Sequence, residues 1–325
     1  MSEFDLIDKY CRGVGPKHRS TIIDVGDDAA VIRPNPNKDL AVSTDTMVEG
    51  VHFLTNTEPS HLAYKILSVN CSDMAAMGAE PKYATLSLTL PSLDATWLEP
   101  FSIALKQQAE RYKIQLIGGD TTRGKLSLSC TIIGLLDPSK VISRDGAKVG
   151  DDVFVSNAVG DAALGLACLQ GELTLPENHR LAAESAHHRP QARVALGMGL
   201  LNIANSGLDV SDGLIADLGH VCAQSGVAMQ IDVAQLPISE AYQYYLDHGG
   251  NHDFALYGGD DYELAFTCKA DRRGEVQALS EDLGLSLTKI GSVIDDQPKL
   301  DKKVILVDDG KPLPSSDVPG FNHFT

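Results

Sequence analysis

The sequence predicts a mixed α/β (α+β) fold with two domains, each built from a mixed sheet packed against helices. The 325 residues are 43% hydrophobic and 22% charged, which is typical of globular proteins and sufficient for two hydrophobic cores. Segments with strand-like and helix-like spacing of apolar residues alternate in two successive series. The polar stretch RDGAKVGDD at 144–152 separates the series, so the predicted domains are residues 1–147 and 148–325.

The first series combines two helices with four strands. The helix expected at 60–79 places Leu62 and Ile66 on its apolar side. The helix expected at 97–112 has Pro100 in its first turn, where the missing N–H is tolerated. The strands are expected at 40–44, 83–90, 114–119 and 126–136.

The second series continues the alternation over a longer stretch of chain. A strand, a turn and a helix are expected in succession over 207–226. The last residues, 308–325, have little regular pattern, so we expect them at the surface. The other strands are expected at 152–156, 227–233, 262–268 and 286–294, and the other helices at 160–170, 191–204, 239–249 and 273–284.

Charge and composition exclude several classes of protein. A formal net charge of -17 argues against binding to nucleic acid or to anionic membranes, which require Lys and Arg. No apolar run approaches the ~18 residues of a membrane-spanning helix, and the acidic N-terminus does not resemble a signal peptide. The six cysteines are scattered without CxxC spacing, which predicts neither zinc nor disulfides and fits a cytoplasmic protein.

Acidic residues recur where apolar segments end. The segment IIDVGDDAAVI at 22–32 places three aspartates in strand-forming sequence, where they repel one another unless a cation lies among them. Each acid beside a glycine could instead be a simple turn former. Their recurrence at strand and helix ends, where ligand sites of α/β proteins gather, favours a cation site. The acids concerned are Asp27, Asp28, Asp45, Asp73, Asp120, Asp209, Asp212, Asp260, Asp261 and Glu263.

Carboxylates without a nearby Cys or His pair select Mg²⁺, Mn²⁺ or Ca²⁺ rather than zinc. No EF-hand loop is present, and Mg²⁺ normally brings phosphate with it, so a nucleotide is expected. The P-loop, the protein-kinase motifs and GxGxxG are absent. Nucleotide binding would then depend on metals, on close backbone approach at glycines and on arginines. GGDTTRG at 118–124, expected to form one turn, and Arg144 are candidates, although Arg123 and Arg144 could both be ordinary surface charges.

The acidic and glycine-rich segments described above, together with others along the chain, resemble the thiamine-monophosphate kinase family, within the aminoimidazole-ribonucleotide-synthetase-like superfamily. The resemblance covers nearly the whole chain, and STDTMVEGVHF and GGDTTRG favour this family over its superfamily neighbours. One position departs from the family pattern: Asp260 stands where the family usually has Glu, which shortens the side chain by one methylene. The matching segments are VGDDAAVI, STDTMVEGVHF, AYKILSVNCSDMAAMGAEP, QLIGGDTTRG, ISRDGAKVGD, LDVSDGLIADLGH, GGDDYELAF and GFNHF.

The resemblance implies a two-domain synthetase-like fold and a homodimer whose N-terminal sheets pair. It implies phosphorylation of thiamine monophosphate to thiamine diphosphate with ATP as co-substrate and several Mg²⁺ ions. The implied metal ligands are Asp28, Ser43, Thr44, Asp45, Asp73, Asp120, Asp209 and Asp212. The implied nucleotide contacts are Tyr112, Gly119, Asp120, Arg144 and Ser211, and the implied thiamine-phosphate contacts are His52, Asp260 and Phe321.

The chemistry of such a reaction needs no protein nucleophile. A phosphate monoester has a second pKa of about 6, so the acceptor is already largely ionised at neutral pH. We expect direct in-line transfer supported by metals and Arg144, with an aspartyl phosphate as the rival. Three other functions remain open: another ATP-using enzyme of the superfamily, a metal-stabilised binding protein, and a metal-dependent phosphohydrolase. His52, Tyr112 and Phe321 could instead be packing residues.

Overall fold

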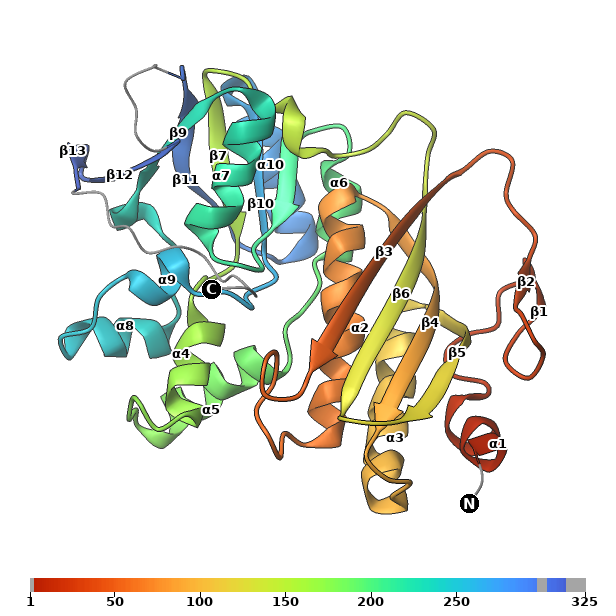
Figure 1. Ribbon diagram of the computed structural model, residues 1–325. Helices are drawn as coiled ribbons and strands as arrows, with labels where there is room; N and C mark the ends of the chain where they lie inside the picture. Colours follow the sequence, from red (N-terminus) through yellow and green to blue (C-terminus); the bar gives the residue numbers. More distant parts are fainter. Residues whose placement is uncertain (1–2, 297–302, 314–325) are drawn as a thin grey trace. The chain divides into compact units, whose positions relative to one another are not determined.

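The computed structural model describes residues 3–296 and 303–313 (Figure 1). These residues form two compact units. Unit 1 comprises the chain up to Met74 together with Ala79–Ser139, and unit 2 comprises Ala75–Gly78 together with the chain from Lys140 onward. Each unit contains a mixed sheet packed against helices, which confirms the predicted fold class. The boundary between residues 147 and 148 stays a prediction.

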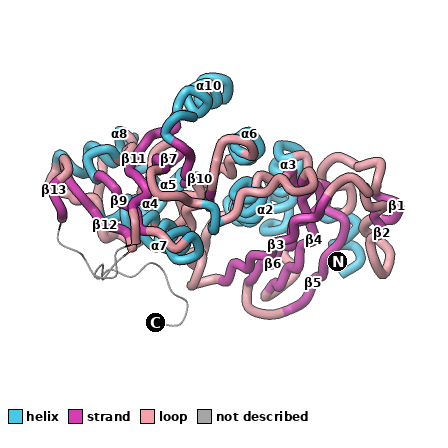
Figure 2. The backbone as a smooth tube through the Cα atoms, turned by 90° about the horizontal axis from the view of Figure 1, so that it is seen from above, coloured by secondary structure: helices cyan, strands magenta, loops and turns pink. Residues whose placement is uncertain are grey.

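Unit 1 is organised around a four-stranded sheet. Its elements are α1 (Glu3–Leu6), η1 (Ile7–Cys11), β1 (Thr21–Ile23), β2 (Val31–Ile32), β3 (Asp39–Val48), α2 (Pro59–Met77), β4 (Glu80–Leu90), α3 (Ala95–Tyr112), β5 (Gln115–Arg123) and β6 (Ser127–Leu136). The strand order is β3-β6-β4-β5, with only the β4–β5 pair parallel. Helices α2 and α3 lie against the same face of this sheet (Figures 1 and 2).

Helix α3 begins earlier than predicted because Asp94 caps it. The Asp94 carboxylate accepts a hydrogen bond of 2.8 Å from the Thr96 backbone N–H. Pro100 therefore lies in the second turn, and its placement in the first turn was wrong. The helix ends at Lys113, whose φ of 58° is the left-handed conformation that commonly terminates helices.

Two strands of unit 1 extend further than predicted, and this relocates two acidic residues. β3 continues through Asp45, which pairs with Cys130, and β5 continues through Asp120, which pairs with Ser87. The expectation that both acids follow strand ends was wrong, as was the expectation that 118–124 form a turn. Asp45 lies between Thr44 and Thr46, and Asp120 is followed by two threonines, which favour extended backbone. At Asp120, pairing with a neighbouring strand also outweighs the turn preference of Gly-Asp.

Unit 2 is organised around a seven-stranded sheet. Its elements are η2 (Arg144–Gly146), β7 (Asp151–Ser156), α4 (Asp161–Leu169), α5 (Glu177–His188), α6 (Val194–Leu200), β8 (Ser206–Asp209), α7 (Leu214–Ser225), β9 (Ala228–Asp232), η3 (Val233–Gln235), α8 (Glu240–Asp247), α9 (Asp253–Tyr257), β10 (Leu264–Lys269), η4 (Ala270–Arg272), α10 (Arg273–Leu283), β11 (Leu287–Ile294), β12 (Val304–Asp308) and β13 (Lys311–Pro312). The strand order is β13-β12-β9-β11-β7-β10-β8, with only the β12–β9 pair parallel.

Several elements of unit 2 were not predicted. Helix α5 buries only Ala183 and His187, so its sequence has too few apolar residues to produce a helical pattern. Helix α9 and strands β12 and β13 are short, and short elements give weak periodicity. Among the helices of the described residues, none is long and apolar enough to span a membrane.

A buried carboxylate connects β7 to its neighbours in unit 2. Asp152 is 3% exposed, and it contacts Arg273 of α10 at 2.9 Å and Lys289 of β11 at 2.8 Å. The hydrogen bond from Arg273, followed by the contribution of Lys289, holds the pKa of Asp152 below its usual value. A carboxylate with a lowered folded-state pKa stabilises the fold at neutral pH and loses that contribution under acid.

Replacing Asp152 by Asn should therefore destabilise unit 2 in a pH-dependent way. We expect Asp152→Asn to lower the free energy of unfolding by about 1 kcal/mol or more at pH 7. The difference from the wild type should shrink below about pH 4, where the unfolded carboxyl protonates and the folded group follows. Urea denaturation at pH 7 and pH 3 measures this. An equal loss at both pH values would contradict the assignment.

Candidate functional site

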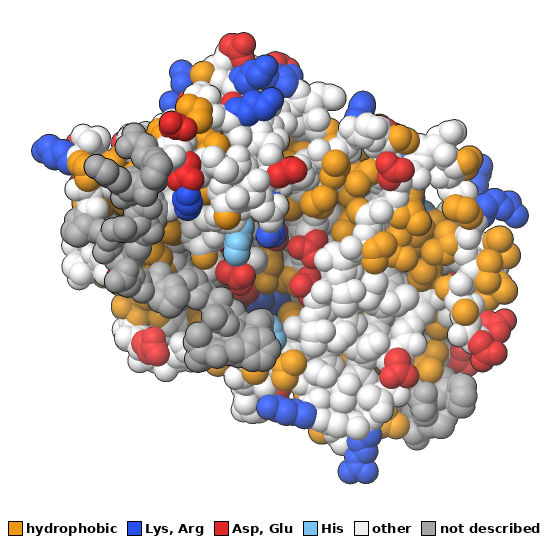
Figure 3. All heavy atoms as spheres, turned by 45° about the horizontal axis from the view of Figure 1, so that its top comes forward, with side chains coloured by type: hydrophobic (Ala, Val, Ile, Leu, Met, Phe, Trp, Pro, Cys, Tyr) orange, Lys and Arg blue, Asp and Glu red, His pale blue; other side chains and the backbone are white. Residues whose placement is uncertain are grey.

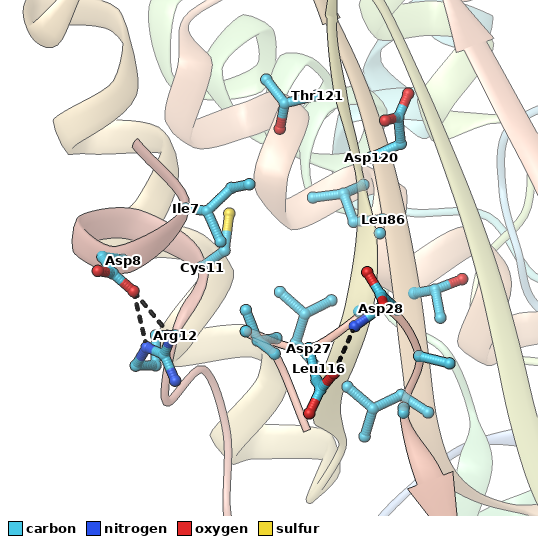
Figure 4. A pocket seen from close by; sticks show the side chains of 18 residues that line it. Ile7, Asp8, Cys11, Arg12, Asp27, Asp28, Leu86, Leu116, Asp120 and Thr121 are labelled. Atoms are coloured by element: carbon cyan, nitrogen blue, oxygen red, sulfur yellow. Dashed lines mark hydrogen bonds and ion pairs between the residues drawn. The ribbon is translucent and has the colours of Figure 1, made fainter. Parts of the chain in front are cut away.

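A cavity of about 610 Å³ in unit 1 gathers predicted site residues (Figure 4). It brings together the N-terminal helical turn, the loop at 25–30 and strands β4 and β5, which are far apart in sequence. Three predicted site residues, Asp28, Gly119 and Asp120, line it, together with Asp27. The other lining residues are Ile7, Asp8, Cys11, Arg12, Val25, Gly26, Ala29, Ala30, Thr85, Leu86, Leu116, Ile117, Gly118 and Thr121.

The backbone around this cavity depends on Gly119. Its φ is 155°, and a Cβ there would lie 1.9 Å from the carbonyl oxygen of Leu86. No side chain fits, so β5 can approach β4 closely just before Asp120. On the facing loop, the Asp27 carboxylate accepts the backbone N–H of Asp28 at 2.9 Å. Asp27 thus shapes the loop that presents Asp28, which agrees with the alternative that an acid beside a glycine is a turn former.

Strand β3 and helix α2 are joined through other predicted site residues. The Ser43 hydroxyl donates to the Asp73 carboxylate at 2.5 Å, and the Asp45 backbone N–H donates to the side-chain oxygen of Asn70 at 3.3 Å. The pleat turns Thr44 to the opposite face, where its hydroxyl lies 2.8 Å from that of Thr131. The structure therefore brings Ser43 and Asp73 together but separates the Thr44 hydroxyl from them.

Two further predicted contacts in unit 1 have structural partners of their own. The Nδ1 atom of His52 accepts the backbone N–H of Val48 at 3.1 Å. The Tyr112 hydroxyl lies 3.4 Å from the Ser68 hydroxyl, and burial raises the pKa of Tyr112 to about 12, so the phenol stays protonated at neutral pH.

In unit 2, the last residue of β8 and the loop that leads to α7 carry three predicted site residues. Asp209 ends β8 and is buried, and Ser211 and Asp212 follow it directly before α7 begins. Asp217, in the first turn of α7, accepts the backbone N–H groups of Ser211 and Asp212, both at 3.0 Å. Burial raises the pKa of Asp217 to about 7, and these two hydrogen bonds and the charge of Arg144 act in the opposite direction.

A second loop of unit 2 carries Asp260. Its φ of 72° and the φ of 52° at Tyr262 are left-handed conformations that non-glycine residues seldom adopt. The Tyr262 hydroxyl donates to the Asp260 carboxylate at 3.2 Å, and Nδ1 of the buried His187 lies 3.6 Å from that carboxylate. Tyr262 and His187 therefore fix the position of the Asp260 carboxylate, whose side chain is one methylene shorter than the Glu usual in the family.

One predicted contact, Phe321, lies outside the described residues. Within residues 3–296 and 303–313, no three or more His, Cys, Asp or Glu side chains group closely enough to hold a metal ion. The carboxylates are instead distributed over the cavity, the β3–α2 contact and the two loops of unit 2.

Comparison with known proteins identifies the family. Models of the AIR synthase related protein, N-terminal and C-terminal domains, match residues 26–136 and 148–302. A thiamine-monophosphate kinase of Salmonella typhimurium is 43% identical over 99% of this chain and 98% of its own. The chain belongs to the thiamine-monophosphate kinase family.

Solved structures of this family have the same fold. A thiamine-monophosphate kinase from Stenotrophomonas maltophilia K279a has a TM-score of 0.86 at 41% identity, covering 96% of this chain and 98% of its own. A structure described as AaThiL complexed with AMPPCP and TMP has a TM-score of 0.78 at 35% identity, covering 99% and 96%. The family resemblance predicted from the motifs is therefore confirmed.

Sequence reasoning missed two residues that contact the predicted site of this family member. His187 lies in the unpredicted helix α5, so nothing marked it. Asp217 was detectable, because an acidic residue in the first turn of a helix that follows Ser-Asp-Gly can accept backbone N–H groups of the preceding loop.

Proposed function

We infer that this chain transfers the terminal phosphoryl group of ATP to thiamine monophosphate, forming thiamine diphosphate. The observation that carries this inference is the likeness to thiamine-monophosphate kinases over the full length of both chains. The relative in complex with AMPPCP and TMP supports ATP as the co-substrate and TMP as the acceptor. The cavity of unit 1, with Asp28 and Asp120 in its wall, provides a site of the expected chemistry.

The obstacle to this reaction is repulsion between two polyanions. The acceptor phosphate is already an oxyanion at neutral pH, so its activation requires no strong base. What the protein must supply is alignment of the two phosphates and compensation of their charge. A net charge of -17 makes this protein a poor source of positive charge on its own.

Mg²⁺ fits the donor atoms that the structure presents. The predicted ligands are carboxylates and hydroxyls, which are the donors that hard divalent cations prefer. Cys11 also lines the cavity, but burial raises the pKa of its thiol to about 11, so it stays protonated at neutral pH. When bound, Mg²⁺ would offset the negative charge of both phosphate groups. The residues proposed to hold several such ions are Asp28, Ser43, Asp45, Asp73, Asp120, Asp209 and Asp212. The family resemblance adds Thr44, whose hydroxyl faces Thr131 on the other side of the sheet.

The proposed contacts to ATP and to thiamine phosphate follow the family pattern, and both predicted domains contribute to them. Residues 1–147 would supply the principal metal and nucleotide contacts and the dimer surface, and residues 148–325 further metal, nucleotide and substrate contacts. For ATP these contacts are Tyr112, Gly119, Asp120, Arg144 and Ser211. For the thiamine phosphate they are His52, Asp260 and Phe321.

Transfer would be direct, with no phosphorylated protein intermediate. Burial raises the pKa of the Cys11 and Cys268 thiols to about 11 and that of the Cys130 and Cys222 thiols to about 12, so these four thiols stay protonated at neutral pH and are poor nucleophiles. Six free cysteines and ATP as a substrate also support a cytoplasmic location.

Phosphorus NMR of the protein with ATP, thiamine monophosphate and Mg²⁺ tests the function. We expect the resonances of a diphosphate ester to grow as the γ-phosphate resonance of ATP disappears. Release of inorganic phosphate alone would indicate a phosphohydrolase, and unconsumed ATP would indicate a binding protein. Either result overturns the proposal, and a stable aspartyl phosphate would overturn direct transfer.

In the same assay, Asp120→Asn should lower the rate by about 100-fold or more, because charge placed at the reacting phosphates acts mainly on the transition state. Its melting temperature should stay close to that of the wild type. Asp39→Asn, which changes an exposed carboxylate at the start of β3, is the matched control and should keep full activity.

We also propose that two copies associate through the face of the unit 1 sheet opposite α2 and α3. Leu40 and Val42 on this face are 58% and 62% exposed, and they pair with Leu135 and Ile133 of β6. Figure 3 shows hydrophobic side chains gathered over a broad area of the molecular surface. An apolar sheet face of this kind favours a partner, and a second copy agrees with the homodimer that the family resemblance implies.

Val42→Glu should convert the dimer to a monomer, because it places a charge in the apolar contact. Light scattering coupled to size-exclusion chromatography measures the mass. Ile103→Glu is the control, since Ile103 is 53% exposed on helix α3 and lies away from this face. A monomeric wild type, or a Val42→Glu protein that stays dimeric, would refute the proposed interface.

A further inference from the structure

Two loops of unit 2 are hydrogen-bonded to each other along their backbones. The 209–213 loop carries predicted metal and nucleotide contacts, and the 258–263 loop carries the predicted acceptor contact Asp260. Three backbone hydrogen bonds of 2.8–2.9 Å connect them, from Asp260 to Ser211, from Tyr262 to Val210 and from Val210 to Glu263. The loops are therefore paired much as two strands are.

Glycines bring these loops closer than side chains would allow. A Cβ on Gly259 would lie 2.4 Å from the carbonyl oxygen of Ser211. A Cβ on Gly213, whose φ is 113°, would lie 2.7 Å from the carbonyl oxygen of Tyr257. Both distances are well inside van der Waals contact, so no side chain fits at either glycine. Gly259 packs on the 209–213 loop, and Gly213 packs on the last residue of α9, directly before the 258–263 loop.

A buried carboxylate anchors the 209–213 loop. Asp217 is 4% exposed, and one of its oxygens accepts the backbone N–H groups of both Ser211 and Asp212 at 3.0 Å. Because Asp217 belongs to helix α7, these bonds tie the loop to a regular element. Asp217 itself is not among the residues assigned to metal, nucleotide or acceptor.

A second buried carboxylate anchors the 258–263 loop. Glu263 is 4% exposed and accepts hydrogen bonds from the Ser156 hydroxyl at 2.5 Å, from the Asn157 amide at 3.1 Å and from Nε of Arg193 at 2.7 Å. Arg193 also reaches its other oxygen, so the ion pair is bidentate. These bonds hold in place a loop in which Asp260 and Tyr262 adopt left-handed conformations that cost energy.

We propose that Asp217 and Glu263 are positioning residues that hold the two loops as one rigid element. The nucleotide-side and acceptor-side contacts of unit 2 are then fixed relative to each other before either substrate binds. A substitution of Asp217 or Glu263 therefore changes the contacts to both substrates, because the two loops move together. The consequence for substrates rests on the proposed kinase function, whereas the coupling of the loops does not.

Hydrogen–deuterium exchange of the full chain tests the coupling without reference to catalysis. Asp217→Ala should speed exchange at the Asp260 and Tyr262 amides, although Asp217 contacts neither. Should this variant fail to fold, Glu263→Gln provides the converse test, since it retains side-chain volume and should speed exchange within the 209–213 loop. Exchange that rises only in the loop directly contacted would overturn the proposal.

Steady-state kinetics then test the consequence for substrates. Loss of two hydrogen bonds in Asp217→Ala should raise KM about tenfold for both ATP and thiamine monophosphate. Asp217→Asn retains an acceptor oxygen and should stay within about threefold of the wild type. A merely structural role would lower the melting temperature and leave both KM values unchanged, and a rise in only one KM would likewise overturn the proposal.

Asp232→Ala is the matched control for both measurements. The Asp232 carboxylate also accepts a backbone N–H, that of Ala234 at 3.2 Å, but it contacts neither loop. Its exchange pattern in the two loops and its KM values should equal those of the wild type. A wild type inactive in the phosphorus NMR assay would refute the kinase function, while the exchange result would still decide whether the loops are coupled.

Discussion

Repulsion between negative charges is the constraint on which the proposed function depends. Two like charges 4 Å apart repel by about 1 kcal/mol in water and by about 4 kcal/mol near a protein surface. Asp28 and Asp120 share the wall of one cavity in a protein of net charge -17, and the proposed substrates are polyanions themselves. Divalent cations would relieve all three sources of repulsion together, which is why the proposed function depends on them.

Presenting those carboxylates is mainly a task for the backbone. At Gly119 strand β5 approaches β4 where no Cβ fits. Gly259 allows an equally close contact with Ser211, and Gly213 allows one with Tyr257 at the end of α9. Asp27 and Asp217 accept backbone N–H groups of the loops that carry the predicted ligands. Acidic residues thus have two roles here: some face the substrates in the proposed mechanism, and others hold the loops that position them.

The sequence predicted the fold class and the family because both depend on long patterns. Alternating periodicity marked most strands and helices, and the motifs marked the family. It misplaced Asp45 and Asp120 just after strand ends, because pairing with strands distant in sequence extends the backbone through both positions. At Asp120 the local Gly-Asp dipeptide also favours a turn. It missed α5, whose buried face is small, and it missed the contact of His187 with Asp260, which depends on tertiary packing.

The most direct test of the central claim is thermal unfolding with AMPPCP in the presence and absence of Mg²⁺. If cations bind the nucleotide to the carboxylates, AMPPCP with Mg²⁺ at about 100 times its Kd should stabilise the protein by about 2.7 kcal/mol. AMPPCP with a chelator should give little stabilisation. Asp28→Asn should reduce the stabilisation that AMPPCP and Mg²⁺ give together. Equal stabilisation by AMPPCP with and without Mg²⁺ would contradict the account.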